Sequence, residues 1–119
     1  MTEELQHSRL PEGATHHQVS NRGVQSWIQP YGDAFGAIAR VWVKDENGER
    51  ACLQQGVAVS AQQIHGLTED QIELRKHSLI AEAKVVIDAA LDFIEQHGPK
   101  AYREMVEQQE LEQNSGSES

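Results

Sequence analysis

The chain has 119 residues, of which 19 are acidic and 10 are lysine or arginine, giving a formal charge of −9. This length fits one domain, since domains usually run to about 100–150 residues. The mean hydropathy is −0.61 and no apolar run approaches the roughly 18–20 residues that span a bilayer, which excludes a membrane span. The single Cys52 excludes an internal disulfide framework and a zinc site built on several thiolates.

The negative charge is concentrated in the second half of the chain. Residues 1–60 hold five basic and seven acidic side chains, a net of −2, whereas residues 61–119 hold five and twelve, a net of −7. Such a half repels phosphate backbones. It either serves as a solubilising helical surface, or it docks on a basic protein surface or mimics nucleic acid. The first residues lack the basic and apolar regions of a secretory signal, and we expect a cytoplasmic protein.

Both ends of the chain are polar. Residues 1–18 contain two leucines and no aromatic residue, which predicts a flexible N-terminal arm that buries too little apolar surface to order itself. Residues 114–119 predict a disordered tail by the same argument. Residues 19–113 are then left to form a single α+β domain.

Residues 19–60 predict a small antiparallel sheet of two to three strands. A short apolar stretch at 24–29 precedes turn residues at 30–33, and residues 37–44 alternate clearly between two faces. Asn47-Gly48 then predicts a hairpin whose return strand begins at Arg50. Gly56 within that return strand predicts a bulge or a bend.

Residues 68–97 predict one long amphipathic helix. Thr68 is a good N-cap with Gln71 at N3, and Gly98 followed by Pro99 predicts its end and the start of a terminal helix over 99–113. The long helix would span about 45 Å at 1.5 Å per residue, so it either breaks near His77-Ser78 or covers a further surface. Its apolar stripe predicts a homodimer, with these candidate self-association residues: Ile72, Leu79, Val86 and Ile94.

Four of the six aromatic residues lie close together in the predicted sheet. Aromatic side chains are either buried in a core or exposed in a partner-binding patch, and the sequence leaves both open. Two cations, Arg40 and Lys44, lie near these aromatic residues in the sequence. Together they give the candidate partner-binding residues, which are Trp27, Tyr31, Phe35, Arg40, Trp42 and Lys44.

Histidine and carboxylate spacings indicate neither a metal centre nor a catalytic site. Glu73 and His77 are four residues apart, an ordinary surface spacing on a helix, and Cys52 has no cation beside it in sequence. We therefore expect no cofactor, no metal and no enzymatic activity. No HxxxH pair is formed by the six histidines, which are His7, His16, His17, His65, His77 and His97.

These observations favour a small non-catalytic protein that acts through protein contacts, as a regulator, inhibitor or adaptor of a nucleic-acid-handling partner. The alternative is a small nucleic-acid-binding protein that uses a basic and aromatic sheet face. The residues of that face would be Arg22, Arg40, Lys44 and Arg50, with Trp27 and Trp42.

Overall fold

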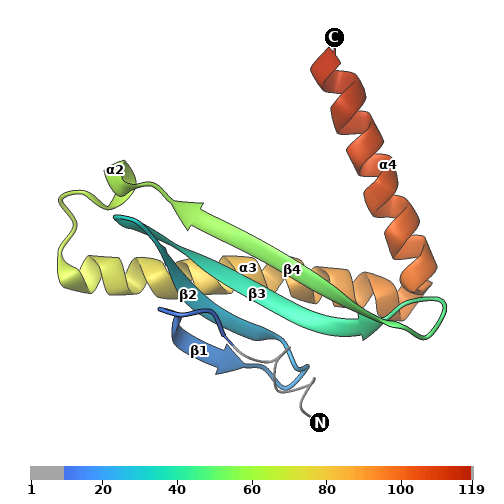
Figure 1. Cartoon of the computed structure of the whole chain (residues 1–119), viewed down its shortest axis with the longest axis horizontal. Helices are drawn as coiled ribbons and strands as arrows, with labels where there is room; N and C mark the ends of the chain where they lie inside the picture. The colour runs from blue at the N-terminus through green and yellow to red at the C-terminus, as the bar shows by residue number, and fades with distance from the viewer. Residues whose placement is uncertain (1–9, 119) are drawn as a thin grey trace.

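A four-stranded antiparallel sheet followed by helices forms the molecule. The computed structural model describes residues 10–118, with side chains described as far as residue 112. The strands β1 (Thr15–Val19), β2 (Gln25–Tyr31), β3 (Ala34–Lys44) and β4 (Arg50–Val59) pair in chain order. The short helix α2 (Ala61–Ile64) leads to α3 (Glu69–His97) and α4 (Pro99–Glu118). Figure 1 shows α3 running along the sheet and α4 projecting away from it.

The α+β class is confirmed, but the predicted number of strands is wrong. The additional strand is β1, which pairs with β2 and lies mostly inside the segment predicted as a flexible arm. Nearly all of its side chains are exposed, and its sequence lacks the alternation of apolar and polar residues that predicts a strand. Backbone hydrogen bonds to β2 stabilise the strand instead. Residues 1–9 of the predicted arm, and residue 119 of the predicted tail, lie outside the described residues.

The hairpin between β3 and β4 forms where Asn47-Gly48 predicts it. Gly48 has φ 80°, and the Asp45 carboxylate accepts hydrogen bonds from the backbone amides of Asn47 and Glu49, each at 2.9 Å. Of the bulge or bend predicted at Gly56, the bulge is absent, because the β3–β4 register runs unbroken from Phe35↔Val59 to Lys44↔Arg50. The irregularity lies instead in β1, between Thr15 and Gln18.

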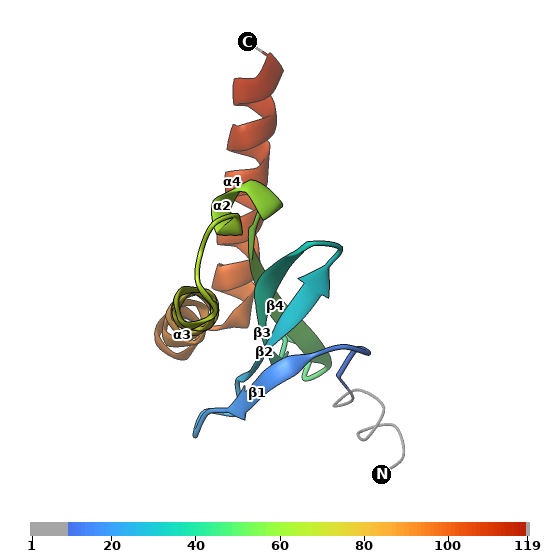
Figure 2. The ribbon, with the colours of Figure 1, turned by 90° about the vertical axis from the view of Figure 1, so that its left-hand side faces the viewer.

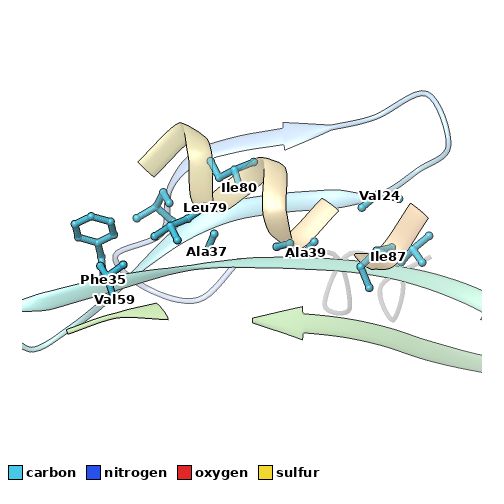
Figure 3. Packing of buried hydrophobic residues seen from close by; sticks show 11 residues of the cluster. Val24, Phe35, Ala37, Ala39, Val59, Leu79, Ile80 and Ile87 are labelled. Carbon is cyan, nitrogen blue, oxygen red and sulfur yellow. The ribbon is translucent and has the colours of Figure 1, made fainter. Parts of the chain in front are cut away.

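The core lies between α3 and one face of the sheet, and Figure 2 shows α3 on that side of the strands. Small residues on β3, Ala37 and Ala39, are fully buried, which lets the helix approach the strand closely. Leu79 and Ile87 of α3 belong to the same buried cluster, and Figure 3 shows Leu79 next to Ala37. The buried cluster comprises Val24, Ile28, Phe35, Ala37, Ala39, Val41, Val59, Leu79, Ile80, Ala83 and Ile87.

The long helix α3 is continuous through His77-Ser78. Its predicted capping box is present: the Thr68 hydroxyl accepts from the Gln71 amide at 3.2 Å, and the Gln71 side chain accepts from the Thr68 amide at 2.9 Å. Gly98, with φ 89°, ends the helix and Pro99 begins α4. α4 extends to Glu118, further than the predicted end at residue 113.

Candidate functional site

An apolar groove opens where α4 leaves the body of the molecule. The groove has a volume of about 470 Å³ and lies between β4, the second half of α3 and the first turns of α4. Among residues 10–118, β4 is the last strand of the sheet and pairs with β3 alone, so its other edge faces this space. Its apolar lining includes Val43, Ala51, Leu53, Val86, Ala90, Ile94, Tyr102 and Val106.

Carboxylates surround this lining, and we call the feature the acid-rimmed groove. Its rim holds Asp45, Glu46, Glu107 and Glu110 against the single cation Arg103, a net of −3. Arg103 ion-pairs with Glu46 at 2.7 Å and with Glu107 at 3.3 Å, which ties α4 to the β3–β4 turn. The backbone amide of Glu46 and the Arg103 guanidinium lower the pKa of the Glu46 carboxyl, so this acid stays ionised at neutral pH.

The candidate self-association residues divide between the core and this groove. Leu79 is buried beneath α3, and Ile72 packs against the same core. Val86, 46% exposed, and the half-buried Ile94 line the acid-rimmed groove. The sheet therefore uses the first half of the predicted stripe, and only its second half remains available to another molecule.

The aromatic cluster also divides. Trp27 is 1% exposed, its ring lies under the Arg40 guanidinium at 4.8 Å, and its indole N–H donates to Gln29 at 3.2 Å. Phe35 is buried in the core, so neither of these two aromatics reaches a partner. Tyr31 is exposed and Trp42 is half-buried under the Arg50 guanidinium.

The sheet face opposite α3 is basic. Because cross-strand partners share a face, the pairs Arg40↔Gln54, Trp42↔Cys52 and Lys44↔Arg50 lie together there. We call this surface, which also carries Gln25, Trp27, Gln29 and Ile38, the outer face. Among its positions on β2, β3 and β4 there is no carboxylate.

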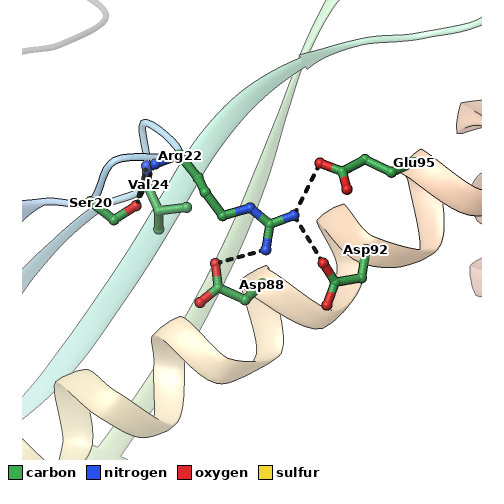
Figure 4. Close-up of polar contacts among 6 residues, drawn as sticks. All are labelled: Ser20, Arg22, Val24, Asp88, Asp92 and Glu95. Atoms are coloured by element: carbon green, nitrogen blue, oxygen red, sulfur yellow. Dashed lines mark hydrogen bonds and ion pairs between the residues drawn. The ribbon is translucent and has the colours of Figure 1, made fainter.

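Arg22 does not join the outer face. It lies between β1 and β2 and reaches α3, where its guanidinium pairs with Asp88 at 3.5 Å, Asp92 at 3.0 Å and Glu95 at 3.2 Å (Figure 4). The Ser20 hydroxyl accepts from the Val24 amide at 3.2 Å and fixes the turn that presents Arg22. The acidic charge of α3 is thus partly neutralised on this side.

Cys52 lies on β4 with its thiol on the outer face. Desolvation raises the pKa of this thiol, and the positive charge of Arg40 offsets the effect only in part. A thiol with a raised pKa carries little thiolate at neutral pH, which is the opposite of what a nucleophile needs.

A cluster that the spacings did not predict joins β1 to α3. The imidazole of His16 hydrogen-bonds through Nε2 to the Glu73 carboxylate, and Nε2 of His77 lies 3.2 Å from the same oxygen. The hydrogen bond from His16 lowers the pKa of Glu73. Glu73 and His77 share a helix face as expected, but His16 is 57 residues away and meets them only because β1 forms. The signal in the sequence is the Glu73-xxx-His77 pair together with the adjacent histidines His16 and His17, which lie in the segment predicted as a flexible arm.

Comparison with family models, with curated proteins and with solved structures finds no match to this chain. Over residues 10–118, no helix combines the length and the apolar character needed to cross a membrane.

Proposed function

We propose that this protein is a non-catalytic cytoplasmic regulator or adaptor that binds a basic amphipathic segment of a partner protein in the acid-rimmed groove. The observation that carries the proposal is the combination of an open apolar lining with a rim of net charge −3. Such a groove is complementary to a segment that has apolar residues on one side and lysine or arginine on the other. A partner that handles nucleic acid supplies segments of this kind, because it carries basic surfaces.

A second copy of the chain is the other candidate occupant. Val86 and Ile94, from the stripe that predicts a homodimer, line the groove and support this alternative. Charge opposes it, since the first turns of α4 carry Glu104, Glu107 and Glu110 and would bring carboxylates against the acidic rim. Sedimentation distinguishes the two: a particle of 13.3 kDa at high concentration eliminates the dimer.

The groove is tested with a short synthetic peptide of leucine and lysine whose leucines fall on one helical face. Its affinity, measured by fluorescence anisotropy, is expected to fall as NaCl rises. Val86→Asp places a charge in the groove and should weaken binding at least about tenfold, the equivalent of roughly 1.4 kcal/mol. Leu74→Asp is the matched control, because Leu74 is an exposed apolar residue of α3 outside the groove. Equal loss in both variants, or an affinity independent of salt, contradicts the proposal.

The outer face supports a second candidate function, binding of single-stranded nucleic acid. The specific observation is that Arg40, Lys44 and Arg50 share this face with Trp42, and that no carboxylate of β2–β4 joins them. Cations follow a phosphate backbone and an aromatic ring stacks on bases. A gel shift with random single-stranded DNA at low salt tests it. Binding that is lost in Lys44→Glu supports this function, whereas no shift at micromolar protein removes it.

A further inference from the structure

The cluster of His16, Glu73 and His77 has the arrangement of a metal-ligand set. Its three ligand atoms all lie within 4.8 Å of one another. In a tetrahedral zinc site with bonds of about 2.0 Å, neighbouring ligand atoms are about 3.3 Å apart. The 3.2 Å between the Glu73 oxygen and His77 Nε2 matches that spacing. The imidazole rings of His16 and His77 lie edge to face, with centroids 5.5 Å apart. Nε2 of each ring contacts the same oxygen of Glu73, so the two nitrogens meet at one point.

The backbone of β1 is irregular at His16, both in its pairing with β2 and in its φ angle. The β1–β2 register shifts between Thr15 and Gln18, so that β1 has one more residue than β2 over this stretch. His16 has φ 60°, and it is the only non-glycine residue with a positive φ between residues 10 and 118. Such a conformation is costly for a residue with a β-carbon and is found where a side chain must be aimed. Here it turns the imidazole of a strand residue toward α3.

A second contact prepares the His16 ring for a metal. Its Nδ1 lies 2.8 Å from the Thr15 hydroxyl, which is able to accept a hydrogen bond from Nδ1–H. That leaves the lone pair of Nε2 for a metal ion, as in many histidine-ligated sites where an outer hydrogen bond fixes the ring. A metal ion would then replace the proton that Nε2 shares with Glu73.

We propose that His16, Glu73 and His77 bind a divalent transition-metal ion, with Zn²⁺ as the best match. Two imidazole nitrogens and one carboxylate oxygen suit zinc, whereas calcium and magnesium prefer oxygen ligands alone. Three protein ligands leave a fourth position for water or for a group from a partner. About half of the Glu73 and His77 side-chain surface is exposed, so the site is open to solvent.

The bound ion would fasten β1 to α3. His16 is the one side chain of β1 that is not largely exposed, so this strand has little apolar contact of its own with the body. Ligands from β1 and from two successive turns of α3 join segments 57 residues apart. Metal binding therefore stabilises the folded chain and orders its N-terminal strand.

The test is calorimetric titration of Zn²⁺ into the tag-free full chain after chelator treatment. One saturable ion per chain is expected, together with a rise in melting temperature. His77→Ala and His16→Asn should lose this binding, and asparagine is chosen at position 16 because it tolerates positive φ. Thr15→Val should weaken affinity by about 10–100-fold, since it removes only the outer hydrogen bond.

Two variants serve as matched controls. His17→Ala removes the neighbouring exposed histidine and His65→Ala removes another, and both should bind Zn²⁺ as the parent chain does. Circular dichroism in chelator should show every variant folded like the parent. The visible absorption spectrum of bound Co²⁺ reports tetrahedral coordination, and this readout does not depend on the heat of binding that calorimetry measures. The proposal is overturned if the parent binds no Zn²⁺, or if His16→Asn and His77→Ala bind it as tightly as the parent.

Discussion

Ser26 is fully buried on β2, and its hydroxyl has no hydrogen-bond partner among the described residues. A buried polar group without a partner costs about 1–3 kcal/mol, while an apolar replacement of similar size avoids that cost. We predict that Ser26→Ala raises the free energy of unfolding by about 1 kcal/mol, the low end of that range. Urea unfolding measures it, and a less stable variant would mean that the hydroxyl makes a favourable contact.

Leu79 is the largest fully buried side chain of α3. It is 1% exposed and packs over the alanines of β3. Leu79→Ala should lower the free energy of unfolding by about 2–5 kcal/mol, because it leaves a cavity that the rigid sheet cannot close. Leu74→Ala, on the same helix but 70% exposed, is the control and should change stability by less than about 0.5 kcal/mol. Similar losses in the two variants would contradict this packing.

The sequence left the burial of the aromatic residues open, because burial depends on partners that are distant along the chain. Trp27 and Tyr31 have the same parity on β2, yet Trp27 is buried and Tyr31 is exposed. Arg40 covers the Trp27 ring across the β2–β3 pair, whereas Tyr31 lies at the end of the strand. The register between β2 and β3 therefore decides which of the two side chains is covered, and this register cannot be read from the sequence of β2 alone.

At the scale of elements, Arg22 connects the β1–β2 turn to α3 through three carboxylates. These groups are partly exposed, so salt screens their attraction. Arg22→Gln should lower the melting temperature at low ionic strength, and the difference from the parent chain should narrow as NaCl rises. A difference that persists unchanged in high salt would assign the effect to packing of the arginine stem instead.

The ion pair between Glu46 and Arg103, which connects α4 to the β3–β4 turn, should depend on pH. Its pKa is lower in the folded chain than the ordinary value near 4.3, so its stabilising contact with Arg103 is fully present above that value. The contribution is lost as the pH falls through the lower, folded-state pKa. NMR titration should show the Glu46 carboxyl and the Arg103 side chain changing together in that acidic window. In Glu46→Gln the change of the Arg103 signal in this window should be smaller than in the parent chain, because only Glu107 then remains paired with Arg103. An Arg103 titration identical to that of the parent would contradict the pairing with Glu46.

Elements with strong local signals were predicted and those held by long-range contacts were not. The capping box at Thr68, the Asn47-Gly48 turn and the stop at Gly98 each depend on a few adjacent residues, and all three are present. β1 depends on backbone pairing with β2, and its polar sequence contains no pattern that predicts this pairing. The sequence of α4 beyond residue 113 likewise lacks the apolar stripe that would predict a helix there.

At the scale of the whole molecule, the charge of −9 is distributed over distinct surfaces. The outer face has Arg40, Lys44 and Arg50 without a carboxylate on β2–β4, while α3, α4 and the β3–β4 turn carry most of the described acids. The sequence predicted an acidic helical half and a nearly neutral sheet half. It did not predict the groove, because the groove exists only where α4 diverges from β4.

The central claim is that the acid-rimmed groove is where this protein meets a basic partner. The most direct measurement is NMR chemical-shift mapping of the labelled chain during titration with the leucine–lysine peptide. We predict that the shifts concentrate at Leu53, Val86, Ile94 and Val106 and diminish in high salt. Shifts confined to the outer face around Trp42 and Arg50, or no shifts at all, would contradict the account.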